Sequence, residues 1–371
     1  MAHTCASGFR LHAFLLGICI AAPVAATDAQ AGLSVGAYVQ RCHERGLCNG
    51  SYLVAKGGRI VYRGAVGVAS ADGHTPLDPA FAFDIGSIAK QFTAAAIVRL
   101  AEQDRLRLDD PVAMHLPGFP YPEITLRQLL NQTSGIPDVM PHYTKLILGG
   151  TAQGPVDLSD VVDVLKDAKL PLTAPPGTAF AYSNTGYALL GRVVEVVSGK
   201  HYAAFLQDEF FDPLGMRHTW VRTPGLDTLP DTDRAYGMRR GKQGMKPFDQ
   251  VPDLYLYGPG GIYATASDLL VWAEALNRGR VMSGAYWTMA TTPVTLPDGS
   301  ISAYGFGFDL SRSSAGARRV SHGGHWRGFK ADLSIYPEND VVVVILTNDG
   351  EDDEVEHARD DIERRMRAAY R

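Results

Sequence analysis

A serine and a lysine three residues apart are the first pair in this sequence whose spacing is compatible with catalysis. Ser87-Ile88-Ala89-Lys90 follows a short strand-like stretch and opens a segment rich in alanine and isoleucine at helical spacing. Residues three apart on a helix share one face, so the lysine can reach the serine hydroxyl. That hydroxyl is a weak nucleophile until a base takes its proton, and a neutral lysine can be the base. Taken alone, the pair also fits a helix N-cap followed by a surface lysine.

A tyrosine and an asparagine form the second candidate element. Tyr182-Ser183-Asn184 lies between a Pro-Pro-Gly-Thr turn at 175–178 and a helical pattern that starts at Tyr187. A cation beside the phenol would lower the pKa of Tyr182 and let it act as a general base. The Asn184 amide could orient a lysine or bind a substrate amide. The alternative is a turn that contains a buried tyrosine.

The third candidate element is His322-Gly323-Gly324, at the end of a predicted strand. Paired glycines allow a ligand to approach a strand edge closely. Backbone N–H groups there, together with the N–H of Ser87, could form an oxyanion hole. His322-x-x-His325 is not interpreted as a metal pair, because no carboxylate or cysteine stands at ligand spacing from it. The sequence therefore predicts neither a metal nor a cofactor.

The scaffold that must position these residues has a pattern of strands, then helices, then strands. Strand signals occur at 51–69 (a hairpin), 81–85, 304–310, 317–322, 329–336 and 341–347. Helix signals occur at 33–48, from 87 to about 103, at 187–198, after Ser267 as a good N-cap to about 277, and at 354–370. Proline, glycine and short helical patterns dominate from about 104 to 254. The pattern predicts an α+β fold, with one antiparallel sheet built from both chain ends, flanking helices and an inserted helical lobe.

The composition is that of a globular protein and does not favour nucleic acid as a partner. Of 371 residues, 46% are hydrophobic and 20% are charged, and the formal net charge is −5. No dense basic stretch is present, whereas phosphate binding needs clustered lysine and arginine.

The N-terminus has the pattern of an export signal. An apolar run from Leu11 to Ala26 follows a basic residue and ends in small residues. Residues 1–26 are therefore predicted to be a signal peptide, with cleavage after Ala26 or as late as Ala31, leaving a single catalytic domain from 27 to 371. The run is short for a membrane span, and no other segment could cross a bilayer. The mature protein is expected to be periplasmic or secreted.

Two cysteines, Cys42 and Cys48, remain in the predicted mature chain. Their spacing could close a small disulfide loop in an oxidising compartment, or they could be two independent buried thiols. Neither has a sequence context that indicates catalysis.

The order of the three elements resembles that of the serine β-lactamase and penicillin-binding protein superfamily. The similarity is greatest to the class C β-lactamase-like branch, which includes D-alanyl-D-alanine carboxypeptidases and esterases. Further segments similar to this family are 129–137, 213–216, 260–265 and 326–329. The resemblance covers nearly the whole mature chain, about 33 to 348, and implies a β-lactamase/transpeptidase-like fold.

The resemblance also implies roles for individual residues. Ser87 would be acylated, Lys90 would assist its deprotonation, and Tyr182 would serve as base and then as acid for the leaving group. Asn184 would contact the substrate and the lysine. The N–H groups of Ser87 and His325 would form the oxyanion hole, and water would complete hydrolysis without metal or cofactor.

The third element departs from the Lys-Thr-Gly of most β-lactamases. His322 and Gly323 replace a fixed cation and a hydroxyl that suit a substrate carboxylate, while Gly324 keeps the family glycine. His322 and Gly324 are still expected to contact substrate. Arg327 is a candidate replacement for the missing cation.

The sequence thus predicts an exported serine hydrolase that acts on ester or amide bonds. Small esters, peptidoglycan-type D-peptides and β-lactams are the candidate substrates. An α/β-hydrolase is not favoured, because the chain has no G-x-S-x-G elbow. The alternative is a penicillin-recognising receptor that is acylated and does not turn over. The oligomeric state is left open.

Overall fold

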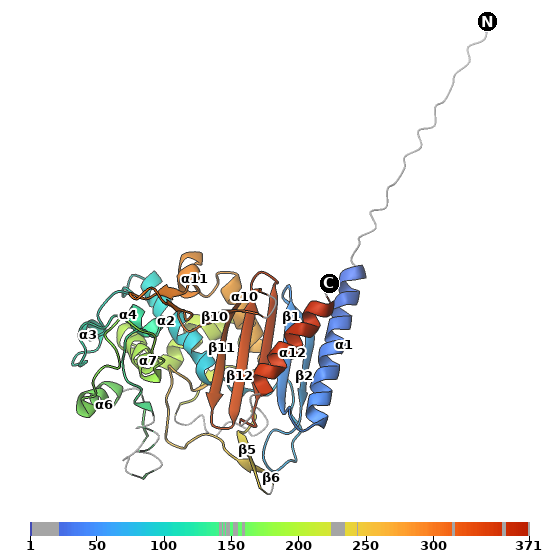
Figure 1. The fold of residues 1–371 in the computed structure, drawn as a ribbon, viewed down its shortest axis with the longest axis horizontal. Helices are drawn as coiled ribbons and strands as arrows, with labels where there is room; N and C mark the ends of the chain where they lie inside the picture. Colours follow the sequence, from blue (N-terminus) through green and yellow to red (C-terminus); the bar gives the residue numbers. More distant parts are fainter. Residues whose placement is uncertain are drawn as a thin grey trace.

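A six-stranded antiparallel sheet formed by both ends of the chain is the centre of the fold (Figure 1). The computed structural model describes residues 1, 22–140, 143, 145, 149–150, 155–157, 160–223, 234–242, 244–313, 316–350 and 354–369. The strands of the sheet are β1 (Gly50–Lys56), β2 (Arg59–Val66), β10 (Asp309–Arg312), β11 (Arg318–Trp326), β12 (Phe329–Tyr336) and β13 (Val341–Thr347). Their spatial order is β10-β11-β12-β13-β1-β2, so β1 lies beside β13 from the other end of the chain. The predicted α+β fold is confirmed.

Helices cover both faces of this sheet, and the alternation along β13 shows why (Figure 1). Helices α1 (Ala22–Glu44) and α12 (Glu354–Ala369) pack on one face, and α10 (Ala266–Asn277) packs on the other. Val343 and Ile345 face the first pair of helices, whereas Val342 and Val344 belong to the larger core on the side of α10. Successive side chains of a strand point to opposite faces, so a continuous apolar run is buried on both.

The helical lobe lies beside the sheet and carries short strands that the sequence pattern did not predict. Its helices are α3 (Val112–His115), α4 (Leu126–Leu130), α6 (Val161–Ala168), α7 (Asn184–Ser198), α8 (Tyr202–Leu206), η3 (Gln207–Phe211) and α9 (Asp212–Leu214). Its strands are β4 (Trp220–Val221), β5 (Met238–Gly241) and β6 (Gly244–Pro247). Near the boundary with the sheet lie β3 (Phe83–Asp84), η1 (Gly86–Ile88), α2 (Ala89–Glu102) and β7 (Ile262–Ala264), followed by α11 (Gly284–Ala290), β8 (Val294–Thr295) and β9 (Ile301–Ser302). Strand β7 pairs with both β3 and β4, and this three-stranded sheet leads directly into η1.

Several of the predicted boundaries are wrong. The first helix, expected at 33–48, spans Ala22–Glu44 as α1. Helix α10 is capped by Thr265, whose side chain accepts the Asp268 N–H at 3.1 Å, and not by Ser267. The strand expected at 304–310 begins only at Asp309, because a turn precedes it. That turn is fixed by packing: Gly307 has a positive φ, and a Cβ there would lie 2.7 Å from the carbonyl oxygen of Lys90 in α2.

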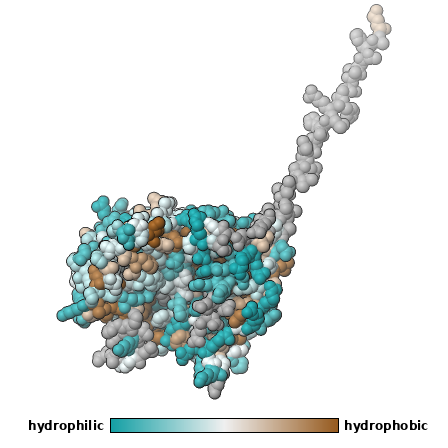
Figure 2. All heavy atoms as spheres, in the orientation of Figure 1, coloured by the Kyte–Doolittle hydropathy of each residue, from teal (hydrophilic) through white to brown (hydrophobic). Residues whose placement is uncertain are grey.

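The N-terminal helix α1 is tied to the sheet by a disulfide. Cys42 and Cys48 are bonded, with 5.3 Å between their Cα atoms, and link the end of α1 to the start of β1. Most of the predicted signal peptide, 2–21, lies outside the described residues. Within the described part of the chain, no helix is both long enough and apolar enough to cross a membrane. The face in Figure 2 is mostly hydrophilic, with apolar side chains scattered mainly over the helical lobe.

Candidate active site

Ser87 lies in η1, a single turn between β3 and α2. The turn is held by the buried Asp84, whose Oδ1 accepts the Gly86 N–H at 2.8 Å. The residue before α2 is Ile88, with no side-chain cap, so Ser87 does not serve as the helix N-cap. Its half-buried side chain instead lines a cavity.

Lys90 is fully buried one turn along and points its amine at the serine. Its Nζ donates to Ser87 Oγ at 3.0 Å, to Asn184 Oδ1 at 2.8 Å and to the Pro259 carbonyl at 3.0 Å. Burial lowers the pKa of Lys90 from 10.5 to about 7, although the carboxylates of Asp138 and Asp309 oppose the shift. A large fraction of the lysine is therefore neutral at pH 7. The amide and carbonyl oxygens then take its two remaining hydrogens, which leaves the lone pair directed at Ser87 Oγ.

Asn184, the first residue of α7, is oriented by the carboxylate of Asp138, which lies in the segment after α4. Its Nδ2 donates to Asp138 Oδ2 at 2.9 Å, and this leaves its Oδ1 facing Lys90. The other carboxylate oxygen accepts from Thr185 Oγ1 at 3.3 Å. The structure thus brings Asn184 to the lysine, as the sequence predicts.

Tyr182 stands at the mouth of the site with 41% of its surface exposed. Desolvation against the cleft raises its pKa, and the hydrogen bond with Ser87 opposes the shift only in part. The expected lowering of the Tyr182 pKa is therefore wrong. The reason is geometric, since Lys90 Nζ lies 4.8 Å from the centre of the tyrosine ring and faces the ring, and that amine is only partly charged. Tyr182 is a protonated phenol at neutral pH.

His322 is buried inside β11, four residues before its end, and is not at the end of a strand. Its Nδ1 lies 2.5 Å from the Gly323 carbonyl oxygen, and its Nε2 lies 2.9 Å from the Tyr304 hydroxyl. Burial lowers the pKa of His322, with the nearby Lys90 adding to the effect and Asp309 opposing it. The ring is thus neutral at pH 7: Nδ1–H donates to the carbonyl, and Nε2 accepts from the tyrosine.

Two glycines bring η1 and the edge of β11 into backbone contact. A Cβ on Gly324 would collide with the Ile85 carbonyl oxygen, and one on Gly86 would lie 2.6 Å from the His325 backbone nitrogen. The hydrogen of Gly324 therefore faces the chain itself. The consequence is that Ser87 and His325, one residue beyond each glycine, line the same cavity.

The register of β11 directs the His325 N–H toward that cavity. The two-residue turn after β11 closes on the pair Trp326–Phe329, and bonded and non-bonded pairs alternate along an antiparallel ladder. His325 is one residue inside the closing pair, so its N–H points away from β12. On that side β10 pairs with β11 only as far as Ser321, which leaves the edge open to η1.

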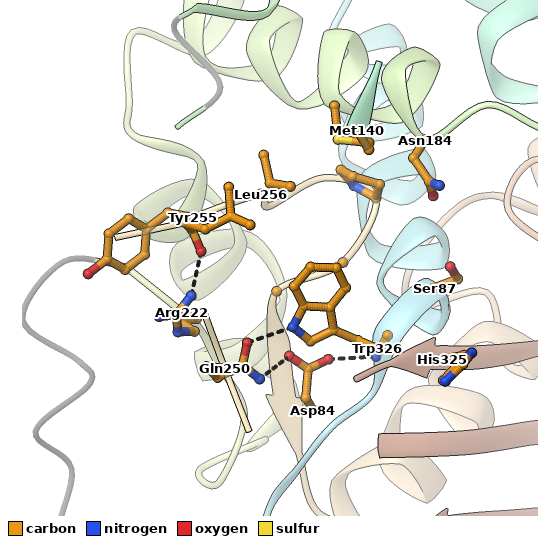
Figure 3. Close-up of a pocket in the computed structure, with 15 residues that line it drawn as sticks. Asp84, Ser87, Met140, Asn184, Arg222, Gln250, Tyr255, Leu256, His325 and Trp326 are labelled. Atoms are coloured by element: carbon orange, nitrogen blue, oxygen red, sulfur yellow. Dashed lines mark hydrogen bonds between the residues drawn. The ribbon is translucent and has the colours of Figure 1, made fainter. Parts of the chain in front are cut away.

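A cavity of about 120 Å³, partly open to solvent, lies beside Ser87 (Figure 3). The residues that line it are Asp84, Gly86, Ser87, Met140, Asn184, Arg222, Gln250, Leu254, Tyr255, Leu256, Pro259, Gly260, Gly261, His325 and Trp326. Tyr182 and His322 are not part of this lining. The rings of Tyr182, His322 and Tyr304 instead lie together, with 5.7 to 6.3 Å between their centres.

Arg327 does not supply the missing cation. Its Nε donates to the Asp249 carbonyl, and its guanidinium lies 4.2 Å from the ring centre of Phe248. The hypothesis that it binds a substrate carboxylate is not supported by this position. Among the described residues, no cluster of three or more His, Cys, Asp or Glu side chains could hold a metal ion.

Sequence reasoning missed several residues that complete the site: Asp84, Asp138, Gln250, Pro259 and Tyr304. One of them carried a readable signal, because Asp84 is a charge inside the apolar stretch 81–85. A charge there needs a buried partner. The others act through contacts with residues 18 to 169 positions away in the chain, such as the Gln250 bond to Asp84, and they show no local pattern.

Comparison with known proteins gives a consistent result. The Beta-lactamase family model matches residues 35–365. A penicillin-binding protein of Bacillus subtilis is 34% identical over 324 residues, which cover 85% of this chain and 71% of that protein. A D-aminopeptidase of Gluconobacter oxydans is 27% identical over 300 residues, covering 81% of this chain and 55% of that protein. The chain thus spans about half the length of the D-aminopeptidase it matches.

Solved structures show the same fold. The penicillin-binding protein from Bacillus halodurans has a TM-score of 0.73 and 28% identity, covering 89% of this chain and 98% of that one. The D-amino acid amidase from Ochrobactrum anthropi has a TM-score of 0.78 and 22% identity, covering 92% and 99%.

Proposed function

The chain belongs to the β-lactamase family of serine hydrolases, and on this premise we propose that it is an exported enzyme that cleaves ester or amide bonds through an acyl-enzyme on Ser87. The observation that carries the proposal is the position of Lys90. Its amine is buried, lies 3.0 Å from Ser87 Oγ and has a pKa lowered to about 7. A base with a pKa near the working pH is the most efficient proton acceptor.

In the proposed acylation step, neutral Lys90 takes the hydroxyl proton of Ser87 as Oγ attacks the substrate carbonyl carbon. The carbonyl π bond breaks, and the oxyanion is held by the N–H groups of Ser87 and His325. These donors are fixed before the substrate binds, so they stabilise the new charge without reorganising. The protonated Lys90 remains hydrogen-bonded to Asn184 and Pro259.

In the next step the carbon–leaving-group bond breaks and the leaving group takes a proton. Tyr182 is placed to deliver it, because its raised pKa keeps the phenol protonated and its hydroxyl is hydrogen-bonded to Ser87. Lys90 can then return its proton to the tyrosine. Water attacks the acyl-enzyme by the same route, with neutral Lys90 as base, and releases the acid and free Ser87.

We also propose export, with cleavage after Ala26. The Cys42–Cys48 disulfide supports an oxidising compartment. Asp28 bonds Arg59 of β2 at 2.7 Å and Ala31 is fully buried, so cleavage after Ala31 would remove both contacts. N-terminal sequencing of exported protein is expected to begin at Thr27. A chain from the cytoplasm that still carries residues 1–26 would contradict the proposal.

The competing function is a penicillin receptor that is acylated and stalls. Intact-mass spectrometry over time after mixing with a penicillin separates the two. A hydrolase is expected to show a transient adduct that returns to the free mass as the drug is consumed. An adduct that persists after the excess drug is removed, with no ester or amide hydrolysed, would favour the receptor.

The neutral His322 predicts a preference for substrates without a carboxylate. A charged hydrogen bond to a carboxylate is worth roughly 1.5–3 kcal/mol, which corresponds to about ten-fold or more in rate. We therefore expect kcat/KM to be higher for a nitrophenyl ester than for a chromogenic cephalosporin. Because burial lowers the His322 pKa, acidifying from pH 8 to pH 6.5 should not restore the cephalosporin rate relative to the ester.

The variant His322→Lys tests the same prediction by adding a cation. It is expected to shift the ratio of the two kcat/KM values toward the cephalosporin by about ten-fold. His322→Gln, which is uncharged, is the matched control and should leave the ratio unchanged. Wild type that prefers the cephalosporin, with a ratio that the lysine does not move, would show that the prediction is wrong.

A further inference from the structure

We propose that Gln250 is a positioning residue that holds the two halves of the oxyanion hole in register. The inference rests on the proposed function of Ser87 and goes beyond it. Gln250 lies in the segment between β6 and β7. Its side chain bonds Asp84, Tyr263 and Trp326, and two of these support the backbones of Ser87 and His325 (Figure 3).

On the serine side the contact runs through Asp84. Gln250 Nε2 donates to Asp84 Oδ2 at 2.9 Å, and Asp84 Oδ1 accepts the N–H of Gly86 at 2.8 Å. Asp84 is only 1% exposed, so its carboxylate has little water to compete for these bonds. The position of Gln250 therefore helps to fix the turn that presents the Ser87 N–H.

On the strand side the contact runs through Trp326. Its indole Nε1–H donates to Gln250 Oε1 at 2.8 Å, and Trp326 directly follows His325 in β11. Fixing the indole fixes the last backbone unit of the strand. One amide thus spans the gap between η1 and β11, the two backbones that carry the proposed oxyanion donors.

The Gln250 amide can adopt only one orientation. Its second Nε2 hydrogen points to the Tyr263 hydroxyl at 2.8 Å. A flipped amide would place its oxygen against the carboxylate of Asp84 and its NH₂ against the indole N–H of Trp326. Both arrangements are repulsive, so the network sets the orientation without ambiguity.

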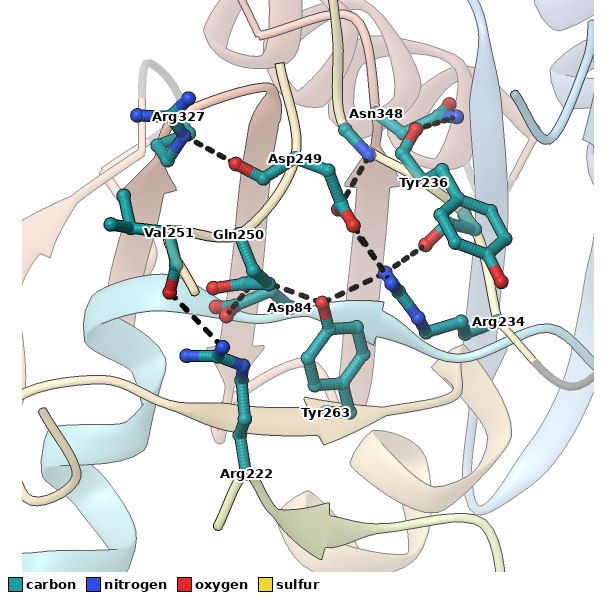
Figure 4. A network of polar contacts seen from close by, with 12 residues as sticks. Asp84, Arg222, Arg234, Tyr236, Asp249, Gln250, Val251, Tyr263, Arg327 and Asn348 are labelled. Carbon is teal, nitrogen blue, oxygen red and sulfur yellow. Dashed lines mark hydrogen bonds and ion pairs between the residues drawn. The ribbon is translucent and has the colours of Figure 1, made fainter. Parts of the chain in front are cut away.

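The backbone around Gln250 is anchored on both sides (Figure 4). Before it, the Phe248 carbonyl accepts the Gly328 N–H at 2.9 Å, in the turn that follows Trp326, and Asp249 is paired with Arg234 at 2.7 Å. After it, the Val251 carbonyl accepts from Arg222 Nη2 at 3.1 Å. The backbone of Gln250 is therefore held in place independently of the partners of its side chain. A misplacement of oxyanion donors by about 1 Å is enough to slow acyl transfer strongly.

The test is the burst of nitrophenol released when Ser87 is acylated by a nitrophenyl ester. Gln250→Ala is expected to lower the acylation rate constant about ten- to hundred-fold, while the ester concentration for half-saturation changes less than about two-fold. Gln40→Ala removes an exposed glutamine on α1 that bonds Glu44, and it should leave both values unchanged. Circular dichroism and the melting temperature establish that each variant is folded.

Gln250→Glu keeps an oxygen for Trp326 but sets a second carboxylate against Asp84. At pH 8 it should be as slow as the alanine variant. At pH 5.5 the two carboxylates share a proton, which restores a hydrogen-bond donor to Asp84. The acylation rate constant of Gln250→Glu, relative to wild type, should therefore rise at least about five-fold. The alanine variant, measured the same way, should show no such rise.

A folded Gln250→Ala that acylates at the wild-type rate would overturn the inference. So would a glutamate variant whose rate relative to wild type does not depend on pH, and this comparison stands even if the alanine variant fails to fold. Wild-type protein with no burst and no adduct on Ser87 would instead overturn the proposed function. The two failures are therefore distinguishable.

Discussion

Replacing Ser87 with alanine is expected to abolish covalent labelling by a β-lactam or a fluorophosphonate and to lower kcat/KM for a nitrophenyl ester by at least about 10⁴-fold. The expected loss is this large because Ser87 Oγ is the proposed atom that forms the bond to the substrate. Lys90, Tyr182 and the two backbone donors all act on that atom or on the group attached to it. Water can replace the serine only at the rate that the remaining binding groups support.

Intact-mass spectrometry followed by peptide mapping measures this directly. The adduct should appear on the peptide that contains Ser87 and be absent from the variant. Ser267→Ala is the matched control, because Ser267 lies on α10 in an exposed contact with Arg63 and should leave labelling and hydrolysis unchanged. An adduct on another serine, with Ser87→Ala still active, would contradict the assignment of Ser87 as the nucleophile.

The features of the fold that were predictable are those encoded by neighbouring residues. The hairpin of β1 and β2 turns at Gly57-Gly58, where both residues have positive φ, as two adjacent glycines indicate. The apolar run 341–346 predicted a strand buried on both faces, and β13 lies between β12 and β1. Gly199 ends α7 in the left-handed conformation, as expected for a glycine after a helix.

The errors arose where two local signals competed and a distant contact decided between them. Thr265 and Ser267 are both good N-caps, but β7 ends at Ala264 and leaves the threonine as the residue that must turn the chain. The stretch from 304 has the apolar spacing of a strand. It turns instead because Gly307 packs on the backbone of Lys90, more than 200 residues earlier.

In the candidate site, too, some features were predictable from the sequence and others were not. The pairing of Ser87 with Lys90 was predictable, because a spacing of three on one helical turn brings the two side chains together. The contact of Asn184 with Lys90 joins residues 94 positions apart in the chain and was expected only from the resemblance to the family. The protonation states were not. The pKa values of Tyr182 and His322 depend on how completely the fold excludes water from each ring, and that property belongs to the assembled cleft and not to the neighbouring residues.

Replacing Lys90 with methionine is expected to lower the acylation rate constant about 10³-fold at pH 8, because the variant has no base within reach of Ser87 Oγ. In wild type the rate should rise with pH through about 7, since only the neutral amine can accept the proton. The methionine variant should lose this titration. Lys90→Arg should be equally slow, because a guanidinium keeps its proton over the whole range.

The measurement is the nitrophenol burst between pH 5.5 and 9, with Lys200→Met as the matched control. Lys200 pairs with Asp208 on the surface, and its loss should leave both the rate and the pH profile unchanged. A wild-type acylation rate constant that does not change from pH 6 to 8 would show that a group other than Lys90 is the base. A Lys90→Met variant that keeps the wild-type pH dependence would show the same.

The burial of Lys90 also makes the free energy of unfolding depend on pH. This dependence distinguishes a variant that has lost catalysis from one that has lost its fold. The unfolded chain holds the Lys90 proton up to its ordinary pKa of 10.5, whereas the folded chain releases it at about 7. Between these values the unfolded state binds more protons, so this group makes the free energy of unfolding increase as pH rises from 7 to 10.5. Lys90→Met removes that slope along with the activity. We therefore expect Lys90→Met to stay folded and to be inactive. Its free energy of unfolding should also depend less on pH between 7 and 10.5 than that of wild type. This result would show that the lysine is buried in the uncharged state that the mechanism needs.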